Sequence, residues 1–233
     1  MNMNNIVLIY KIRESRRKYS MDKKKNISMA VIKRLPKYHR YLQELLRNDV
    51  DRISSKELGE KIGFTASQIR QDLNCFGDFG QQGYGYNVKD LYNQISIILG
   101  LNREYKGVII GAGNIGQAIA NYSRFSQIGL DIEAIFDANP KLLGMRIRDI
   151  EIQDIDILKN YLEDNSIDIG IICVPRINAQ KVCDILVENG VTGIWNFAPV
   201  DLSVPKDVTV ENVHLSESLL TLIYLLHDKN ENK

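Results

Sequence analysis

The chain has 233 residues, of which 44% are hydrophobic and 25% charged, a balance typical of globular proteins with room for two modest domains. Its most apolar stretch, LLTLIYLL (219–226), is far shorter than the roughly 20 residues that span a bilayer, which excludes a membrane span. Three cysteines without CxxC spacing argue against a disulfide framework or a zinc site and indicate reduced thiols in a cytoplasmic protein.

Charge is unevenly distributed along the chain. Residues 1–80 contain 17 Lys and Arg and 9 Asp and Glu, a net charge of +8, whereas the remainder contains 13 and 20, a net charge of −7. This asymmetry indicates a basic module, with nucleic acid as its natural partner, joined to a non-basic one. The charge that follows a brief apolar run near the start argues against a secretory signal. We expect residues 1–28 to be a disordered basic tail, or translation to begin at Met21 or Met29.

The basic segment contains an apolar stripe. Tyr38, Leu42 and Leu45 recur at helical spacing behind Pro36, which can stand at the start of a helix or kink it. Arg34, beside this proline, is an expected DNA contact. The stripe therefore predicts a first helix that packs against the rest of a small domain.

Two short capped helices then predict a helix-turn-helix. In SSKELGEKIG, Ser54 and Glu57 have the spacing of a capping box and Gly63 provides a stop. In TASQIRQDLNCFG, Thr65 and Gln68 repeat the capping box. The second helix of such a motif enters the major groove, where Arg can bind guanine and Gln or Asn can bind adenine. Its expected DNA contacts, which could otherwise serve only to keep the helix soluble, are Ser67, Gln68, Arg70, Gln71 and Asn74.

A glycine-rich segment follows the second helix. GDFGQQGYGYNV (77–88) predicts a tight β-hairpin, in the place where a wing is expected. Its tip carries Gln81 and Gln82, which can hydrogen-bond to DNA without adding positive charge. Tyr84 and Tyr86 in this wing complete the expected DNA contacts.

The stretch VIIGAGNIGQAIANY (108–122) predicts a dinucleotide site. Gly111, Gly113 and Gly116 match GxGxxG between a short apolar strand and a helix, so that a pyrophosphate can rest at the helix N-terminus. The next predicted strand ends at Asp137, 21 residues after the last glycine, near the spacing of the acid that binds the adenosine ribose. Because a carboxylate there would repel a 2′-phosphate, NAD(H) is the expected cofactor rather than NADP(H). Asp137 could otherwise be a cap or turn residue.

Further segments predict a Rossmann-like, doubly wound parallel sheet. IDIGIICVP and GIWNFAP are typical of buried strands, and NAQKVCDILVENG is typical of a helix between them. Ligands of open α/β sheets lie at the carboxyl ends of the strands. The expected cofactor-binding residues at these ends are Gly111, Ala112, Gly113, Asn114, Ile115, Gly116, Asp137, Val174, Pro175, Asn196, Phe197, Ala198 and Pro199.

The sequence offers no convincing catalytic or metal site. None of its three histidines, at 39, 214 and 227, lies in a predicted strand-end loop beside an acid or base, and no Ser/His/Asp order or metal-ligand spacing occurs. Hydride transfer to a substrate requires a positioned proton donor or acceptor, so a regulator is favoured over an enzyme. Two alternatives stay open: an NAD-dependent oxidoreductase with an accessory basic domain, and a CoA-binding module in which Asp137 has no role in ribose binding.

The last segment, HLSESLLTLIYLLHDK (214–229), is apolar nearly all round from Leu219 to Leu226. Such a helix must be buried on several sides, either on its own domain or in a partner subunit. A helix-turn-helix favours the partner, because operators with two half-sites require a two-fold dimer.

Taken in order, several segments carry a family resemblance. They are RLPKYHRYLQ, SSKELGEKIGFTASQIRQDLNCFGDFGQQGYGYNV, GAGNIGQAIANY, FDANPKLLG, CVPRINAQKVCDILVENGVTGIWNFAPVDLSVP and VENVHL. Together they closely resemble the bacterial redox-sensing transcriptional repressors of the Rex family, from about Met29 to the last helix.

This resemblance implies a homodimer that binds an inverted-repeat operator in double-stranded DNA while NADH is scarce. NADH is then the effector that releases the operator, NAD+ competes for the same pocket, and the controlled genes serve fermentation and respiration. The resemblance also implies that Tyr122, Pro175 and the loop 196–199 surround the nicotinamide. Many members have a basic residue where Gln81 and Gln82 stand, which puts the wing's affinity for DNA in question. Many also have an acid where His214 stands, which puts in question a charge pair between that position and Arg40.

The expected fold class is α/β, with an N-terminal winged-helix DNA-binding domain, a Rossmann-like doubly wound parallel sheet domain and a domain-swapped C-terminal helix. The expected boundaries after residue 28 are 29–88 for the winged helix, 89–104 for a connecting helix, 105–212 for the NAD(H)-binding domain and 213–233 for the swapped helix and tail.

Overall fold

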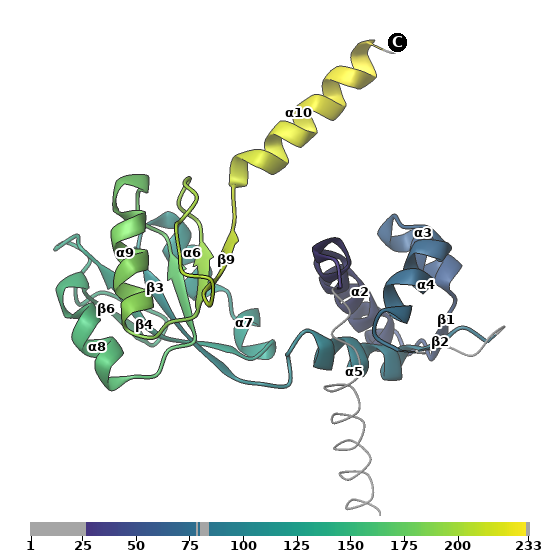
Figure 1. Ribbon diagram of the computed structural model, residues 1–233, viewed down its shortest axis with the longest axis horizontal. Helices are drawn as coiled ribbons and strands as arrows, with labels where there is room; N and C mark the ends of the chain where they lie inside the picture. The colour runs from purple at the N-terminus through teal and green to yellow at the C-terminus, as the bar shows by residue number, and fades with distance from the viewer. Residues whose placement is uncertain (1–26, 78, 80–83, 232–233) are drawn as a thin grey trace, which may run out of the picture. The chain divides into compact units, whose positions relative to one another are not determined.

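The computed structural model of the protein describes residues 27–77, 79 and 84–231. These residues divide into two compact units, with the boundary between Asn102 and Arg103 (Figure 1). Most of the expected N-terminal tail and the wing tip at Gln81 and Gln82 lie outside the described residues.

The described residues of the first unit form four helices and a small two-stranded sheet. Its elements are α2 (Met29–Arg47), β1 (Arg52–Ile53), α3 (Ser55–Ile62), α4 (Ala66–Asn74), β2 (Tyr86–Asn87) and α5 (Val88–Ile98). One hydrophobic core joins all four helices, with Leu35, Leu58, Ile69 and Leu91 among its buried side chains. This core supports the helix-turn-helix formed by α3 and α4.

Local capping sets where these helices begin. Ser54 accepts a hydrogen bond from the N–H of Glu57 at 3.1 Å, and Glu57 accepts one from the N–H of Ser54 at 2.8 Å, so this predicted capping box is confirmed. The second predicted box is wrong, because only its first half forms. Thr65 accepts from the N–H of Gln68 at 3.1 Å, but the side-chain amide of Gln68 donates instead to Asp72.

The first helix starts earlier than the position of Pro36 suggested. Ser28 accepts a hydrogen bond from the N–H of Val31 and caps α2, which begins at Met29 and runs through Pro36. Pro36 therefore lies inside the helix and not at its start. The stripe predicted on this helix is confirmed for Tyr38 and Leu42, both fully buried.

The glycine-rich segment contributes a single described strand. β2 pairs antiparallel with β1, so that Ile53 lies opposite Tyr86. The glycine-rich segment thus pairs with a strand that precedes the helix-turn-helix in the chain. The next helix, α5, packs on α2 and buries Leu91 and Ile95 in the same core. The helix expected as a connection thus forms part of the first unit's core.

The second unit is a seven-stranded sheet with helices on both faces (Figure 1). Its strands are β3 (Tyr105–Ile110), β4 (Leu130–Asp137), β5 (Arg146–Ile147), β6 (Ile150–Asp154), β7 (Ile169–Ile172), β8 (Gly193–Asn196) and β9 (Thr209–Asn212). The spatial order is β5-β6-β4-β3-β7-β8-β9, and every pair is parallel except β5 with β6. The helices are α6 (Asn114–Asn121), α7 (Arg124–Gln127), η1 (Ile155–Ile157), α8 (Leu158–Asp164) and α9 (Arg176–Glu188).

Alternate residues of the central strand face opposite layers. Val108 and Ile110 of β3 belong to the core that α8 and α9 cover, whereas Ile109 belongs to the core that α6 covers. A strand buried on both faces explains the continuous apolar run in the sequence. The predicted Rossmann-like, doubly wound parallel sheet is thereby confirmed.

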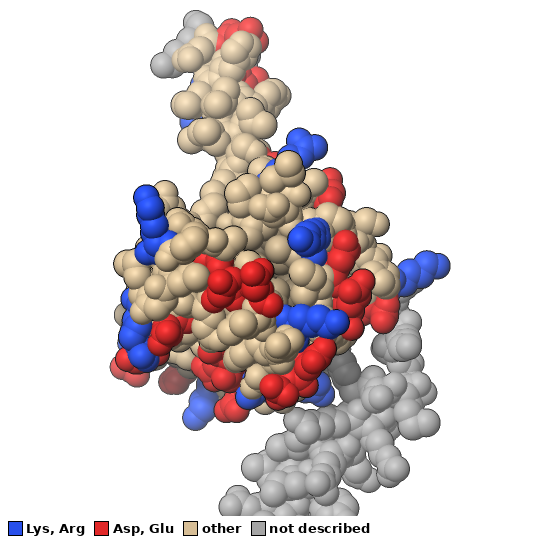
Figure 2. All heavy atoms as spheres, turned by 90° about the vertical axis from the view of Figure 1, so that its left-hand side faces the viewer, with Lys and Arg blue, Asp and Glu red and all other residues tan. Residues whose placement is uncertain are grey.

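The final helix, α10 (Leu215–Glu231), leaves its apolar side chains uncovered by the described chain. Leu219, Leu222 and Tyr224 are 55%, 52% and 67% exposed. Figure 2 shows few charged side chains along this helix, whereas groups of acidic side chains lie among scattered basic ones on the adjoining face of the second unit. Within the described residues, no helix has both the length and the hydropathy for crossing a membrane.

Candidate nucleotide-binding and DNA-binding sites

A cavity of about 690 Å³ lies at the carboxyl ends of β3, β4, β7 and β8. It brings together eight of the residues that the sequence assigned to a cofactor: Gly111, Gly113, Ile115, Asp137, Val174, Pro175, Phe197 and Pro199. Its other lining residues are Ile110, Ala138, Ile155, Asp156, Leu158, Lys159, Cys173, Asn178, Lys181, Val182 and Ile185.

Two glycines keep the first loop close to its neighbours. Gly111 has a φ of +102°, and a Cβ there would lie 2.6 Å from the carbonyl oxygen of Cys173. A Cβ on Gly116 would lie 1.9 Å from the carbonyl oxygen of Gly111, because α6 packs directly on the loop. Any larger side chain would push the helix off the strand.

The start of α6 provides backbone donors beside the cavity. The N-cap residue of α6 is Gly113, which has no side chain that could cap the helix. The first turn of a helix has N–H groups without partners inside the helix, and the helix dipole favours negative charge there. This geometry suits a phosphate or pyrophosphate group.

Asp137 ends β4 with its carboxylate fastened to the glycine-rich loop. Its Oδ2 accepts a hydrogen bond from the N–H of Ala112 at 2.6 Å, and its Oδ1 accepts one from the N–H of Asn139 at 2.7 Å. These two contacts fix the carboxylate at the wall of the cavity. A carboxylate has about four lone-pair sites, so it retains capacity for hydroxyl groups of a ligand.

The loop after β7 contributes Cys173, Val174 and Pro175 to the lining of the cavity. Cys173 lines the cavity, and burial raises the pKa of its thiol to about 12, which keeps the thiol protonated and unreactive. Pro175 is the N-cap residue of α9. No group of three or more His, Cys, Asp or Glu side chains in the described parts of the chain could hold a metal ion.

The loop after β8 is shaped by Asn196, which is fully buried. Its side-chain oxygen accepts from the N–H of Ala198, and its amide nitrogen donates to the carbonyl of Val200 at 2.7 Å and to Oδ1 of Asn212 at 2.9 Å. The sequence placed Asn196 and Ala198 beside the nicotinamide. In the structure both are buried and neither lines the cavity, whereas Phe197 and Pro199 do.

Tyr122 is 49% exposed and does not line the cavity. A row of aromatic rings joins it to the cavity wall: Tyr122 contacts Phe125 at 4.7 Å between ring centroids, Phe125 contacts Trp195 at 5.5 Å, and Trp195 contacts Phe197 at 4.8 Å. The remaining predicted residues, Ala112, Asn114 and Gly116, belong to the loop and the first turn of α6 without lining the cavity.

Two lysines that line the cavity were not predicted from the sequence. Lys159 in α8 and Lys181 in α9 lie on elements that follow other strands, and neither belongs to a recognisable motif. Both have exposed side chains, as expected for cations at the mouth of an open cavity. They add positive charge to a cavity that Asp137 and Asp156 also line.

In the first unit, α4 presents a polar surface. The exposed side chains among the predicted contacts are Ser67, Arg70, Gln71 and Asn74. Arg70 donates a hydrogen bond to Oγ of Ser55 at 2.9 Å, which ties the two helices of the motif together. Tyr84 is 71% exposed, whereas Tyr86 is only 8% exposed and packs in the core. The ring of Tyr86 therefore lies in the domain interior, because β2 turns that side chain inward.

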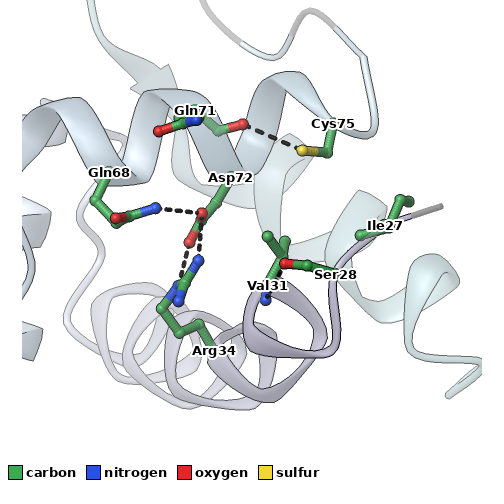
Figure 3. Close-up of a pocket in the computed structure, with 8 residues that line it drawn as sticks. All are labelled: Ile27, Ser28, Val31, Arg34, Gln68, Gln71, Asp72 and Cys75. Atoms are coloured by element: carbon green, nitrogen blue, oxygen red, sulfur yellow. Dashed lines mark hydrogen bonds and ion pairs between the residues drawn. The ribbon is translucent and has the colours of Figure 1, made fainter. Parts of the chain in front are cut away.

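Arg34 and Gln68 are both engaged by the buried carboxylate of Asp72 (Figure 3). Burial by itself would raise the pKa of Asp72, but hydrogen bonds from Arg34, Tyr38 and Gln68 outweigh it, and the pKa lies below its usual range. Asp72 is thus ionised at neutral pH and paired within the protein.

Comparison with protein families matches each unit separately. Residues 26–74 match the family described as a putative DNA-binding protein N-terminus, and residues 102–200 match the family described as a CoA binding domain. A helix-turn-helix unit followed by a glycine-lined cavity in a doubly wound sheet defines the class: a DNA-binding module coupled to a nucleotide-binding module.

Whole-length relatives narrow this class. The redox-sensing transcriptional repressor Rex of Clostridium perfringens is 74% identical over 207 residues, which cover 89% of this chain and 98% of its own. That of Clostridium botulinum (strain Eklund 17B) is 75% identical over 209 residues, which cover 90% of this chain and all of its own. The chain belongs to the Rex family of redox-sensing transcriptional repressors. These names describe a regulator and not an enzyme.

Solved structures agree with this assignment. The crystal structure of RSP in complex with β-NAD+ and operator DNA is 60% identical in sequence to this chain, with a TM-score of 0.83. The match covers 88% of this chain and 94% of the RSP chain. RSP in complex with β-NADH is 57% identical, with a TM-score of 0.82, and covers 88% and 96%. A third is described as RSP, a Rex-family repressor.

Proposed function

We propose that this protein is a cytoplasmic homodimeric repressor that binds an inverted-repeat operator when NADH is scarce and releases it when NADH binds. The controlled genes are those of fermentation and respiration. The observation that carries the proposal is the cavity at Gly111, Gly113 and Asp137, which lies on the same chain as a helix-turn-helix. The relatives solved with NAD+, NADH and operator DNA support the same ligands here.

In this proposal the pyrophosphate of the dinucleotide rests on the first turn of α6, and Asp137 accepts hydrogen bonds from the adenosine ribose. Phe197, Pro199 and Pro175 form an apolar wall for the nicotinamide. NAD+ competes with NADH for the cavity, but its cationic ring loses more hydration on entering an apolar site, so NADH is bound more tightly. Tyr122 belongs to the site through Phe125 and Trp195.

The DNA surface in this proposal consists of Ser67, Arg70, Gln71 and Asn74 on α4, with Tyr84 just before β2. These residues combine one cation with amides that can read bases in the major groove. A two-fold dimer would present two such helices about 34 Å apart, one turn of DNA. We propose that α10 inserts into the partner subunit, because the described residues of its own chain leave its apolar side chains uncovered.

Substitution of Asp137 tests the identity of the ligand. If Asp137 binds the ribose hydroxyls of NADH, Asp137→Ala weakens NADH binding about tenfold, the order expected for a lost charge-assisted hydrogen bond. If the cavity instead serves coenzyme A, as the name of the matched family suggests, Asp137→Ala leaves the affinity for coenzyme A unchanged. Calorimetric titration of the wild type and of Asp137→Ala with NADH, NADPH and coenzyme A separates these outcomes. Asp131→Ala, which changes a carboxylate of β4 that does not line this cavity, is the matched control.

A further inference from the structure

Asp72 of α4 is fully buried, yet its carboxylate accepts four hydrogen bonds. Arg34 donates two of them, from Nε at 2.6 Å and from Nη2 at 2.7 Å. Tyr38 donates the third from its hydroxyl at 2.5 Å, and Gln68 donates the fourth from its amide at 2.8 Å. Figure 3 shows Arg34 and Gln68 converging on this carboxylate from α2 and α4.

This arrangement links two helices that are far apart in the sequence. Arg34 and Tyr38 lie on successive turns of α2, and Asp72 lies 38 residues after Arg34 in the chain. A two-point contact between guanidinium and carboxylate fixes orientation as well as distance, because both N–H···O bonds must stay in line. The contact therefore determines how α4 is rotated about its own axis relative to α2.

The rotation of α4 decides which of its side chains face outward. Ile69 and Leu73 point into the core, on the same side as Asp72. Ser67, Arg70, Gln71 and Asn74 then lie on the exposed side. Apolar contacts alone are tolerant of small rotations, whereas a buried ion pair with four hydrogen bonds loses much of its energy when its geometry changes.

We propose that Asp72 is the positioning residue of the recognition helix, and that Arg34 and Gln68 act through Asp72 instead of contacting DNA. This inference rests on the proposed DNA-binding function. It removes Arg34 and Gln68 from the DNA-contacting surface and leaves Ser67, Arg70, Gln71 and Asn74 on it.

A direct DNA contact by Arg34 is the competing explanation. The Arg34 side chain is 21% exposed, and it lines a hollow of about 350 Å³ together with Gln71 and Cys75. A cation that neutralises a DNA phosphate gives a recognisable signature, because each such contact changes the slope of log affinity against log salt by about one. A positioning residue does not alter that slope.

The test measures operator affinity by fluorescence anisotropy at several salt concentrations, for the full chain and its variants. We expect Asp72→Asn and Arg34→Gln each to lower operator affinity about tenfold, as for one lost charge-assisted hydrogen bond, with the wild-type salt slope. The double variant should be no weaker than Asp72→Asn alone, because both changes break one pair. Asp90→Asn, an exposed carboxylate of α5, is the matched control and should bind as the wild type does.

Gln68→Ala covers the case in which Asp72→Asn fails to fold, as judged by thermal melting. It removes one bond and leaves Arg34 and Tyr38 on the carboxylate. We expect it to weaken binding about threefold, a loss within the range for a single hydrogen bond, with equal effect at every operator base pair. Gln71→Ala, by contrast, should relax preference at one base pair.

Three results would overturn the inference. They are a salt slope lowered by about one in Arg34→Gln, additive losses in the double variant, or a base-specific loss in Gln68→Ala. Failure of the wild-type protein to bind any operator would instead overturn the proposed function, and that result is visible before any variant is made.

Discussion

The side-chain amide of Asn196 at the end of β8 donates a hydrogen bond of 2.9 Å to Oδ1 of Asn212 at the end of β9. Asn212 in turn donates to Asp201 at 3.2 Å, and Asp201 lies 3.6 Å from the ring of His214, immediately before α10. The loop that lines the cavity is thus joined by polar contacts to the base of the last helix.

Removal of Asn212 should loosen the cavity loop. Asn212→Ala deprives the buried amide of Asn196 of one acceptor, so we expect the free energy of unfolding to fall by about 1–2 kcal/mol. NADH affinity should fall as well, because Phe197 and Pro199 lie on the same loop. Thermal melting and NADH titration check the two effects. Asn165→Ala, which loses one exposed bond to the carbonyl of Tyr161, is the control, and an equal effect there would contradict the account.

The thiol of Cys173 should resist alkylation. With a pKa of about 12, about one thiol in ten thousand is ionised at pH 8, and the thiolate is the reactive form. We expect iodoacetamide to label the half-buried Cys75 first, and NADH to slow the labelling of Cys173 further because Cys173 lines the cavity. Peptide mass spectrometry over time measures both rates. Labelling of Cys173 that is insensitive to NADH would argue against dinucleotide binding in this cavity.

Acid should destabilise the first unit through His39. Its ring stacks on Tyr92 at 4.5 Å and contacts Oγ of Ser96 at 3.1 Å, and burial lowers its pKa. The unfolded chain then binds a proton more readily than the folded one, so stability present above pH ~6.5 is lost as the pH falls toward the folded pKa. Urea unfolding between pH 8 and pH 5 should show this loss in the wild type and a flatter profile in His39→Phe. Lys89→Gln, an exposed residue of α5, is the control and should keep the wild-type profile.

A charge on α10 should disrupt the proposed dimer. Leu222 and Leu225 are each 52% exposed in the single chain, and an apolar helix surface of this kind is stable in water only when a partner covers it. We expect Leu222→Asp to shift the protein toward monomer and to weaken operator binding, since two half-sites no longer act together. Sedimentation velocity gives the oligomeric state. Lys229→Glu, in the polar last turn, should remain dimeric.

Local sequence patterns predicted most of the fold because they reflect short-range physics. The Ser54–Glu57 capping box, the glycine-rich turn and the continuous apolar strand of 108–110 each follow from residues close together in the chain. What the sequence could not show depended on contacts between distant residues. Gln68 has the spacing of a capping box, but its side-chain amide donates a hydrogen bond to Asp72 instead. That bond is the stronger one, because the carboxylate of Asp72 is buried and charged.

The candidate sites show the same division. Gly111 and Asp137 belong to a motif with fixed spacing, and the structure brings them to one cavity. Lys159 and Lys181 reach that cavity from helices after other strands, so no linear pattern marks them. Tyr84 and Tyr86 are two residues apart, a spacing that would place both side chains on one face of a strand. Tyr84 precedes β2, however, and the pairing of β2 with β1 directs Tyr86 alone into the core.

Titration of a labelled operator complex with NADH, NAD+ and NADPH at fixed salt, with anisotropy as the signal, tests whether NADH controls operator binding. We expect release by NADH, competition by NAD+ and little response to NADPH. Because coupling is reciprocal, operator DNA must weaken NADH binding by the same factor, and a tenfold effect corresponds to about 1.4 kcal/mol. Tight operator binding that ignores NADH, or NADH binding that ignores the operator, would contradict the account.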